Sequence, residues 1–113
     1  MRSVVSPSSL AWSALVVSGV LEAVWATALG RSEGFSRLAP TLVFVAALVA
    51  SMAGLAFALR TLPVGTSYAV WVGIGAALTV TWSMATGGEA VSLVKVLLVL
   101  GLVGCVVGLK LLH

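Results

Sequence analysis

Charged side chains are scarce in this sequence. Only 8% of the 113 residues are Asp, Glu, Lys or Arg, whereas a soluble globular domain contains about 25%. Hydrophobic residues make up 61%, and the mean hydropathy is +1.23. This composition excludes a soluble domain and indicates a membrane protein. The net charge of +3 comes from a few cations between apolar runs, which do not form a nucleic-acid-binding patch.

Reactive side chains are equally few. The chain has one cysteine, Cys105, and one histidine, the C-terminal His113. A lone cysteine excludes an intramolecular disulfide and a cysteine-based zinc site. Because no nucleophile–base pair and no cluster of metal ligands is visible, we expect neither an enzyme nor a protein that holds a metal or a cofactor.

The charges gather in short segments that separate four long apolar runs. These runs cover approximately residues 10–30, 38–59, 64–85 and 91–112. Each is long enough to cross a hydrocarbon core of about 30 Å. We therefore predict an all-α membrane protein in which residues 1–113 form a single transmembrane domain of four helices.

The cations divide equally between the two sides of such a domain. If the four helices alternate across the membrane, three Lys or Arg residues lie on each side: Arg2, Arg60 and Lys110 on one, and Arg31, Arg37 and Lys95 on the other. The positive-inside rule therefore gives no preferred orientation. A protein that inserts in both orientations needs this balance.

One acid stands inside the first apolar run. Glu22 is the only charged residue between Leu10 and Gly30. At about 1.5 Å per residue, it lies roughly 18 Å from one end of that helix and 12 Å from the other. A fixed charge near the bilayer midplane costs about 2.5–3.5 kcal/mol on insertion scales. We therefore interpret Glu22 as a functional carboxylate.

Polar and aromatic residues of the first two runs are candidates to surround this acid. Ser18 and Trp25 share a helical face with Glu22, at spacings of −4 and +3, so a hydroxyl and an indole can line one cavity with it. Ser51 is the polar member of a stripe of small residues in the second run. Its hydroxyl either belongs to the site or bonds back to a helix carbonyl, and the pattern favours neither.

The third run carries a face of aromatic residues and glycine. Tyr68, Trp71 and Gly75 fall on this face at i, i+3 and i+7. The Tyr68 hydroxyl lies one to two turns inside the membrane, where it needs a hydrogen-bond partner, and a midplane carboxylate can serve. Gly73 and Gly75 either form a hinge near the middle of the helix or serve helix packing.

The fourth run has the pattern of a helix-pairing segment. No charge lies between Lys95 and Lys110. Gly101, Gly104 and Gly108 form a stripe of small residues that includes a GxxxG pattern. We therefore predict that this stripe packs against another subunit.

Together these motifs resemble the small multidrug resistance family, four-helix proton-coupled exporters of cations, over about residues 10–110. The resemblance is carried by the helix 1 acid, by the turn and proline that precede helix 2, and most specifically by the helix 3 motif: Glu22, Gly34 and Phe35, Pro40, and residues 62–75. Within the family, Trp25 three residues after the acid resembles the guanidinium exporter subtype. Ser51 and the Gly73–Gly75 pair point the same way.

The resemblance implies an antiparallel dimer of two copies in the bacterial inner membrane. It implies that the two Glu22 side chains face one shared cavity, that helix 4 pairs the subunits, and that four residues line or support the cavity: Trp25, Ser51, Tyr68 and Trp71.

Protons and a small guanidinyl cation are then expected to compete for the Glu22 pair. Burial and the second carboxylate both favour the protonated form, and the two acids titrate as a coupled pair. A planar guanidinium ion donates paired hydrogen bonds to carboxylates, and aromatic faces tolerate a desolvated cation. Because each ligand excludes the other, switching the cavity between the two sides gives antiport.

Departures from the subtype keep alternatives open. Val72 stands where the guanidinium subtype usually has threonine, which leaves a broad exporter of quaternary ammonium cations as the alternative. Arg31 after Gly30, and Ala90 after Glu89, also differ from the family pattern and allow one half of a heterodimer with a paralogous chain. A membrane scaffold that uses its glycine stripes only for assembly is a further alternative, but it leaves Glu22 unexplained.

Overall fold

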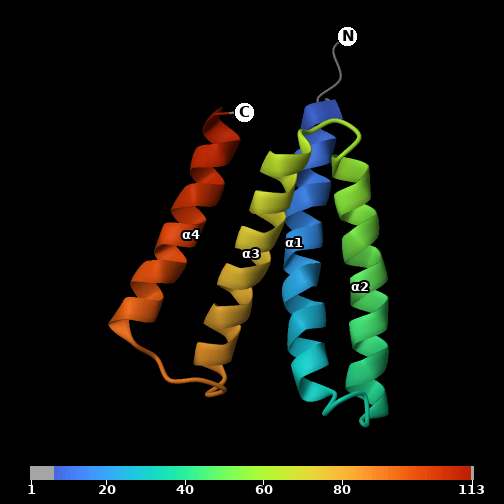
Figure 1. Cartoon of the computed structure of the whole chain (residues 1–113), viewed down its shortest axis with the longest axis vertical. Helices are drawn as coiled ribbons and strands as arrows, with labels where there is room; N and C mark the ends of the chain where they lie inside the picture. Colours follow the sequence, from blue (N-terminus) through green and yellow to red (C-terminus); the bar gives the residue numbers. More distant parts are fainter. Residues whose placement is uncertain (1–6, 113) are drawn as a thin grey trace.

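Four helices account for nearly all of the chain in the computed structural model, which describes residues 7–112 (Figure 1). They are α1 (Pro7–Arg31), α2 (Leu38–Ala58), α3 (Val64–Ala85) and α4 (Leu93–Leu112). Each is long and apolar enough to cross a membrane, which confirms the predicted all-α class with four membrane-spanning helices. Arg2 and His113, which the sequence interpretation used, lie outside the described residues.

Two helix ends differ from the expected ranges by more than one residue. Helix α1 already includes Pro7, the first described residue and three residues before the predicted start, and proline is well tolerated in the first turn of a helix. Helix α4 begins at Leu93 because the Ser92 hydroxyl caps it: Ser92 Oγ accepts the backbone N–H of Lys95 at 3.1 Å.

An ion pair holds the segment that leads into α4. The Lys95 ammonium donates to the Glu89 carboxylate at 2.9 Å and to the carbonyl of Ala90 at 3.0 Å. Hydrogen bonds from Lys95 and then from Ser83 lower the pKa of the Glu89 carboxyl, so this acid stays ionised at neutral pH. The pair therefore fixes how the chain turns from α3 to α4.

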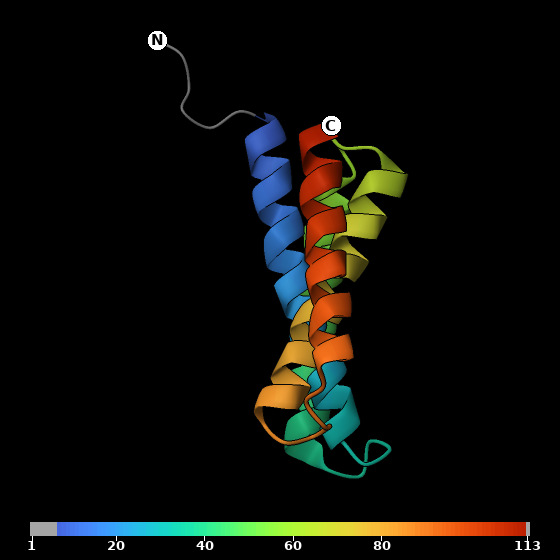
Figure 2. The same cartoon turned by 90° about the vertical axis from the view of Figure 1, so that its left-hand side faces the viewer.

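The helices form a flat row rather than a closed bundle (Figures 1 and 2). Helix α1 packs between α2 and α3, and the backbone of α4 lies beside α3 alone. At the end of α4, the Lys110 ammonium reaches the Trp12 ring of α1, 5.3 Å from its centroid. The molecule measures 50 × 34 × 24 Å. Helix α1 begins and α4 ends on the same side of the molecule, at the top in Figure 1, as four alternating helices require.

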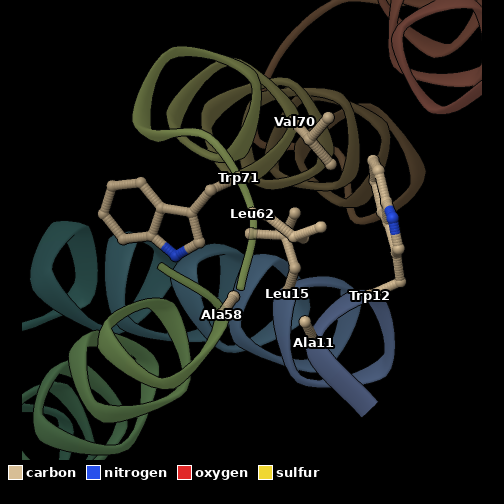
Figure 3. Packing of buried hydrophobic residues seen from close by; sticks show 7 residues of the cluster. All are labelled: Ala11, Trp12, Leu15, Ala58, Leu62, Val70 and Trp71. Atoms are coloured by element: carbon tan, nitrogen blue, oxygen red, sulfur yellow. The ribbon is translucent and has the colours of Figure 1, made fainter. Parts of the chain in front are cut away.

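The hydrophobic core lies near one end of the helices, where α1 begins and where a turn joins α2 to α3. Its seven buried residues come from α1, α2, α3 and the α2–α3 turn: Ala11, Trp12, Leu15, Ala58, Leu62, Val70 and Trp71. Leu15 and Leu62 lie between the two indoles, with Trp71 on one side and Trp12 on the other (Figure 3). Leu15 is completely buried, so this cluster fixes α1 against α3 at that end.

Small residues bring the helix backbones close together. A methyl group at Gly54 of α2 would lie 2.8 Å from Ser18 Cβ in α1, and one at Gly19 of α1 would lie 2.8 Å from the Ile74 side chain in α3. Real Cβ atoms do not approach this closely. Glycine is therefore required at both contacts, as is common for helices that pack in lipid.

Candidate functional site

Glu22 projects from the middle of α1 onto the backbone of α3. A Cβ atom added at Gly75 would overlap the Glu22 carboxylate, and it would lie 2.9 Å from Glu22 Cγ. Only the absence of a side chain at Gly75 leaves room for the acid. The carboxylate is thus held at a helix–helix contact inside the row.

The Glu22 carboxylate has an unsatisfied oxygen. Its Oε1 atom is buried, and it has no hydrogen-bond partner among residues 7–112. A buried carboxylate oxygen without a donor is costly, because the lost hydration is not replaced. This atom is therefore available to a donor from outside the subunit, such as a proton or a cation with N–H groups.

A chain of hydrogen bonds ties three helices together beside this acid. The Trp71 indole N–H of α3 donates to Ser51 Oγ of α2 at 3.1 Å, and Ser51 Oγ donates to the Ser18 carbonyl of α1 at 2.7 Å. Ser18 Oγ in turn donates to the Leu15 carbonyl at 2.9 Å within its own helix. Ser51 thus bonds to a helix carbonyl, but to that of a neighbouring helix, and it also accepts a bond from the predicted aromatic face.

These hydrogen bonds occupy the side-chain donors of Ser51 and Trp71, which are then not available to Glu22. Ser51 has one hydroxyl hydrogen and Trp71 one indole hydrogen, and both are engaged. Both side chains are buried, at 0% and 6% exposure. We infer that Ser51 and Trp71 support the site by fixing the positions of the helices around Glu22.

Trp25 lies three residues after the acid and keeps an unused donor. Its indole Nε1 is buried without a hydrogen-bond partner in the described part of the chain. Its ring packs edge-to-face on Phe44 of α2, with centroids 6.0 Å apart, and Phe35 packs on the other side of Phe44 at 5.7 Å. The sequence reasoning missed Phe44, although it is one of only two aromatic residues in α2.

Tyr68 does not make the contact with Glu22 that the sequence analysis expects. Its side chain is 58% exposed, and its ring lies 6.0 Å from that of Trp71. Within residues 7–112 its hydroxyl makes no hydrogen bond to Glu22, so in a single subunit it faces outward from the row. Val72, the residue after Trp71, is partly buried and packs against the hydrophobic core.

The glycines of α3 and α4 have different surroundings. Gly73 faces α4, where an added Cβ would lie 2.7 Å from Val106, and Gly75 faces Glu22. Helix α3 continues without interruption through both. The structure thus gives each a packing reason, and a hinge there stays a prediction. The α4 glycines Gly101, Gly104 and Gly108 have nothing near an added Cβ atom.

The site offers a carboxylate, unused donors and aromatic surface, but no metal-binding set. No group of three His, Cys, Asp or Glu residues that could hold a metal ion occurs between residues 7 and 112. A lone carboxylate flanked by indoles is suited to a small organic cation, which the acid attracts and the rings accommodate.

The sequence matches the family model described as Small Multidrug Resistance protein over residues 10–103. It is 44% identical over 102 residues to the guanidinium exporter of Yersinia pseudotuberculosis serotype I, a match that covers 90% of this chain and 98% of that relative. The guanidinium exporters of Citrobacter freundii and Salmonella typhimurium are each 43% identical over 102 residues, with 90% of this chain and 97% of each relative covered. These matches include Glu22 and all of α2 and α3.

Proposed function

Because the chain belongs to the small multidrug resistance family, and is therefore a multi-pass small-cation exporter of the bacterial inner membrane, we propose that it exports guanidinium or small guanidinyl cations in exchange for protons. The substrate class is taken from the relatives that are named guanidinium exporters. The proposed exchange site is Glu22.

The observation that carries the proposal is the unsatisfied Oε1 atom of Glu22, held against Gly75. A guanidinium ion has a planar set of N–H donors that matches a carboxylate, and binding replaces the hydrogen bonds that burial removed. A proton on the same oxygen removes the charge that attracts the cation. Proton and substrate therefore exclude each other at one group.

Two subunits in antiparallel arrangement complete the proposed site. A second Glu22 facing the same cavity would favour retention of a proton on the pair, because two close carboxylates resist ionising together. The outward-facing Tyr68 and the open glycine stripe of α4 both fit a partner subunit, since neither is covered within one chain. Loss of a proton on one side and uptake of the cation there then couple the two fluxes.

A titration of guanidinium binding at several pH values tests the proposal. With purified protein, we expect the dissociation constant to increase as the pH falls, approaching about tenfold per pH unit when one proton competes for the site. Glu22→Gln keeps the size of the side chain but cannot titrate, so it should abolish both guanidinium binding and its pH dependence. Binding that does not depend on pH in the unmodified protein would contradict competition.

Val72 supports a second candidate, export of bulkier quaternary ammonium cations. Its apolar side chain next to Trp71 provides no hydroxyl to orient a guanidinium ion. Competition between guanidinium and tetra-alkylammonium ions for the same site separates the candidates. Displacement by tetra-alkylammonium at lower concentration than by guanidinium would favour the broad exporter.

A further inference from the structure

A concave surface lies on the opposite side of α1 from Glu22. It is an elongated groove of about 600 Å³ between α1, α2 and α3, lined by the α1 face from Val20 to Arg31, by the start of α2, and by Leu78 and Trp82 of α3. Val20 and Glu22 are two positions apart, which places them about 200° apart around the helix. The groove is therefore separate from the candidate exchange site.

The groove is apolar along its length and cationic at one end. Its walls are alanine, valine, leucine and proline side chains, with Thr27 as the one hydroxyl, whereas Arg31 and Arg37 stand at its mouth. Both arginines are exposed. Glu33 lies between them in sequence but does not line the groove. The mouth thus attracts anions and repels the cations that the protein exports.

The α1–α2 loop fixes the two arginines at the same end of the groove. The backbone N–H of Arg37 donates to the carbonyl of Ser32, the residue after Arg31, at 3.0 Å. The buried Ser32 hydroxyl donates to the Leu29 carbonyl at 2.7 Å and accepts the Phe35 N–H at 3.2 Å. These bonds close the loop on itself, so Arg31 and Arg37 are brought together by the backbone.

The groove has the depth of one membrane leaflet. From Val20 to Arg31 there are eleven helical steps, or about 16 Å, against about 15 Å for half of a hydrocarbon core. Trp82, half-exposed at the mouth, has the amphipathic character of residues found at the membrane interface. The arginines are thus at headgroup level, and the valines at acyl-chain level.

We propose that this groove binds one phospholipid with an anionic headgroup, its phosphate held by Arg31 and Arg37 and one acyl chain lying along Val20, Val24 and Val43. Arginine is suited to this role because its planar guanidinium donates paired hydrogen bonds to phosphate oxygens. The proposal does not depend on which cation the protein exports or on proton coupling.

Native mass spectrometry of the purified full-length protein, with phosphatidylglycerol or phosphatidylcholine added, tests this site. We expect preferential retention of phosphatidylglycerol, and a decrease of about tenfold or more in that preference in an Arg31→Gln/Arg37→Gln variant, because each arginine supplies charge-assisted bonds. Val43→Trp fills the groove without changing its charge. It should lower the retention of both lipids.

Lys110→Gln is the matched control, because it removes an exposed cation in the last turn of α4. This helix ends on the opposite side of the molecule from the α1–α2 loop (Figure 1). Lys110→Gln should leave the preference unchanged. Equal loss in the Lys110 variant, unchanged retention in the arginine or Val43 variants, or displacement of the lipid by an equal concentration of inorganic phosphate would each overturn the proposal. So would a disulfide between two subunits through Val43→Cys, since a second copy would then occupy the groove.

Discussion

Glu22 keeps its position in α1 because Gly75 of α3 has no side chain. A methyl group at Gly75 would overlap the carboxylate, so Gly75→Ala must displace the acid from this contact. Since the proposed substrate bonds depend on the carboxylate position, we expect guanidinium affinity to fall by about tenfold or more, the loss of roughly one charge-assisted hydrogen bond. Binding titration of the purified variant measures the effect.

Gly65→Ala provides the control in the same helix. Nothing lies within 4 Å of a Cβ atom added at Gly65, and the change is again glycine to alanine within α3. Gly65→Ala should therefore keep the original affinity. If the two variants bound guanidinium equally well, the contact between Gly75 and Glu22 would have no role in the site.

The two buried serines of α2 and α3 make a second matched pair. Ser51→Ala removes the acceptor of the Trp71 indole and the donor to the Ser18 carbonyl. The buried indole N–H is then left unsatisfied, whereas the Ser18 carbonyl keeps its bond within α1. We expect a loss of about 1 kcal/mol in the free energy of unfolding, within the range for hydrogen bonds between membrane helices. Unfolding by a denaturing detergent, followed by circular dichroism, measures this.

Ser67→Ala should behave in the opposite way. Ser67 is also completely buried, but its Oγ atom has no partner in the described part of the chain. Replacing an unsatisfied hydroxyl with hydrogen removes a desolvation penalty and no bond, so stability should stay equal or increase. A larger loss in the Ser67 variant than in the Ser51 variant would contradict this account.

At the scale of single residues, the sequence indicates which side chains share a helical face, but not how they pair between helices. The cost of a charge in an apolar helix singled out Glu22, and helical spacing placed Trp71 and Gly75 on one face of α3. The bond from Trp71 to Ser51 depends on how α2 and α3 flank α1, which spacing within one helix does not contain. For the same reason the exposure of Tyr68 was not foreseen.

Among the helices, α4 is the one that a single chain leaves uncovered. None of its described residues is buried, and its backbone lies beside α3 alone, with Val106 and Leu109 packed against the core. Only Lys110, in its last turn, reaches α1, at the Trp12 ring. At 100° per residue, Gly104 lies about 200° around the helix from Val106, so the glycine stripe faces away from the rest of the subunit. This is consistent with the predicted subunit-pairing role.

Leucine at Gly104 and Gly108 should therefore disrupt assembly without disturbing the fold of the chain. Both positions have open space in the single subunit, so the added side chains clash only with a closely packed partner. We expect conversion of dimer to monomer with unchanged helix content, measured by light scattering and circular dichroism. Val103→Phe, which adds bulk at an exposed position about 100° or more around α4 from each of the three glycines, should leave the dimer intact.

The ends of the elements were predictable where charges or prolines mark them and less so elsewhere. Charged residues limit the apolar runs, and α2 and α3 begin where expected. The start of α4 moved to Leu93 because the Ser92 cap determines it, and a hydrophobicity pattern does not register a single hydroxyl. Small residues indicated close helix packing, but not that Gly54 meets Ser18.

At the scale of the whole molecule, the distribution of cations between its two ends influences how the protein is oriented in the membrane. Among residues 7–112, Arg60 and Lys110 lie at one end and Arg31, Arg37 and Lys95 at the other, and Arg2 precedes α1. With so little difference, one added charge should decide the orientation. Thr61→Lys should hold the Arg60 end in the cytoplasm, and Ser36→Lys should hold the opposite end there.

Reporters fused to the C-terminus, one active only in the cytoplasm and one only outside it, measure the outcome. The unmodified chain should give signal with both reporters, and the two lysine variants should give opposite single signals. If the unmodified chain showed one orientation only, the antiparallel homodimer would be excluded, and a heterodimer with a paralogous chain would take its place. Residue charges alone indicated this balance, whereas the flat row of helices needed the structure.

The chain of bonds from Trp71 through Ser51 to the Ser18 carbonyl also has a mechanical consequence. Because it joins α3, α2 and α1 at a single hydroxyl, none of these three helices can slide or rotate against another without breaking a buried bond. Together they form a rigid block. In the described part of the chain, no buried hydrogen bond of this kind joins α4 to the other helices. Helix α4 packs on α3 through the apolar contact between Val106 and Gly73. We therefore expect the proposed cavity between two subunits to open and close when the block of α1, α2 and α3 in each subunit tilts relative to α4.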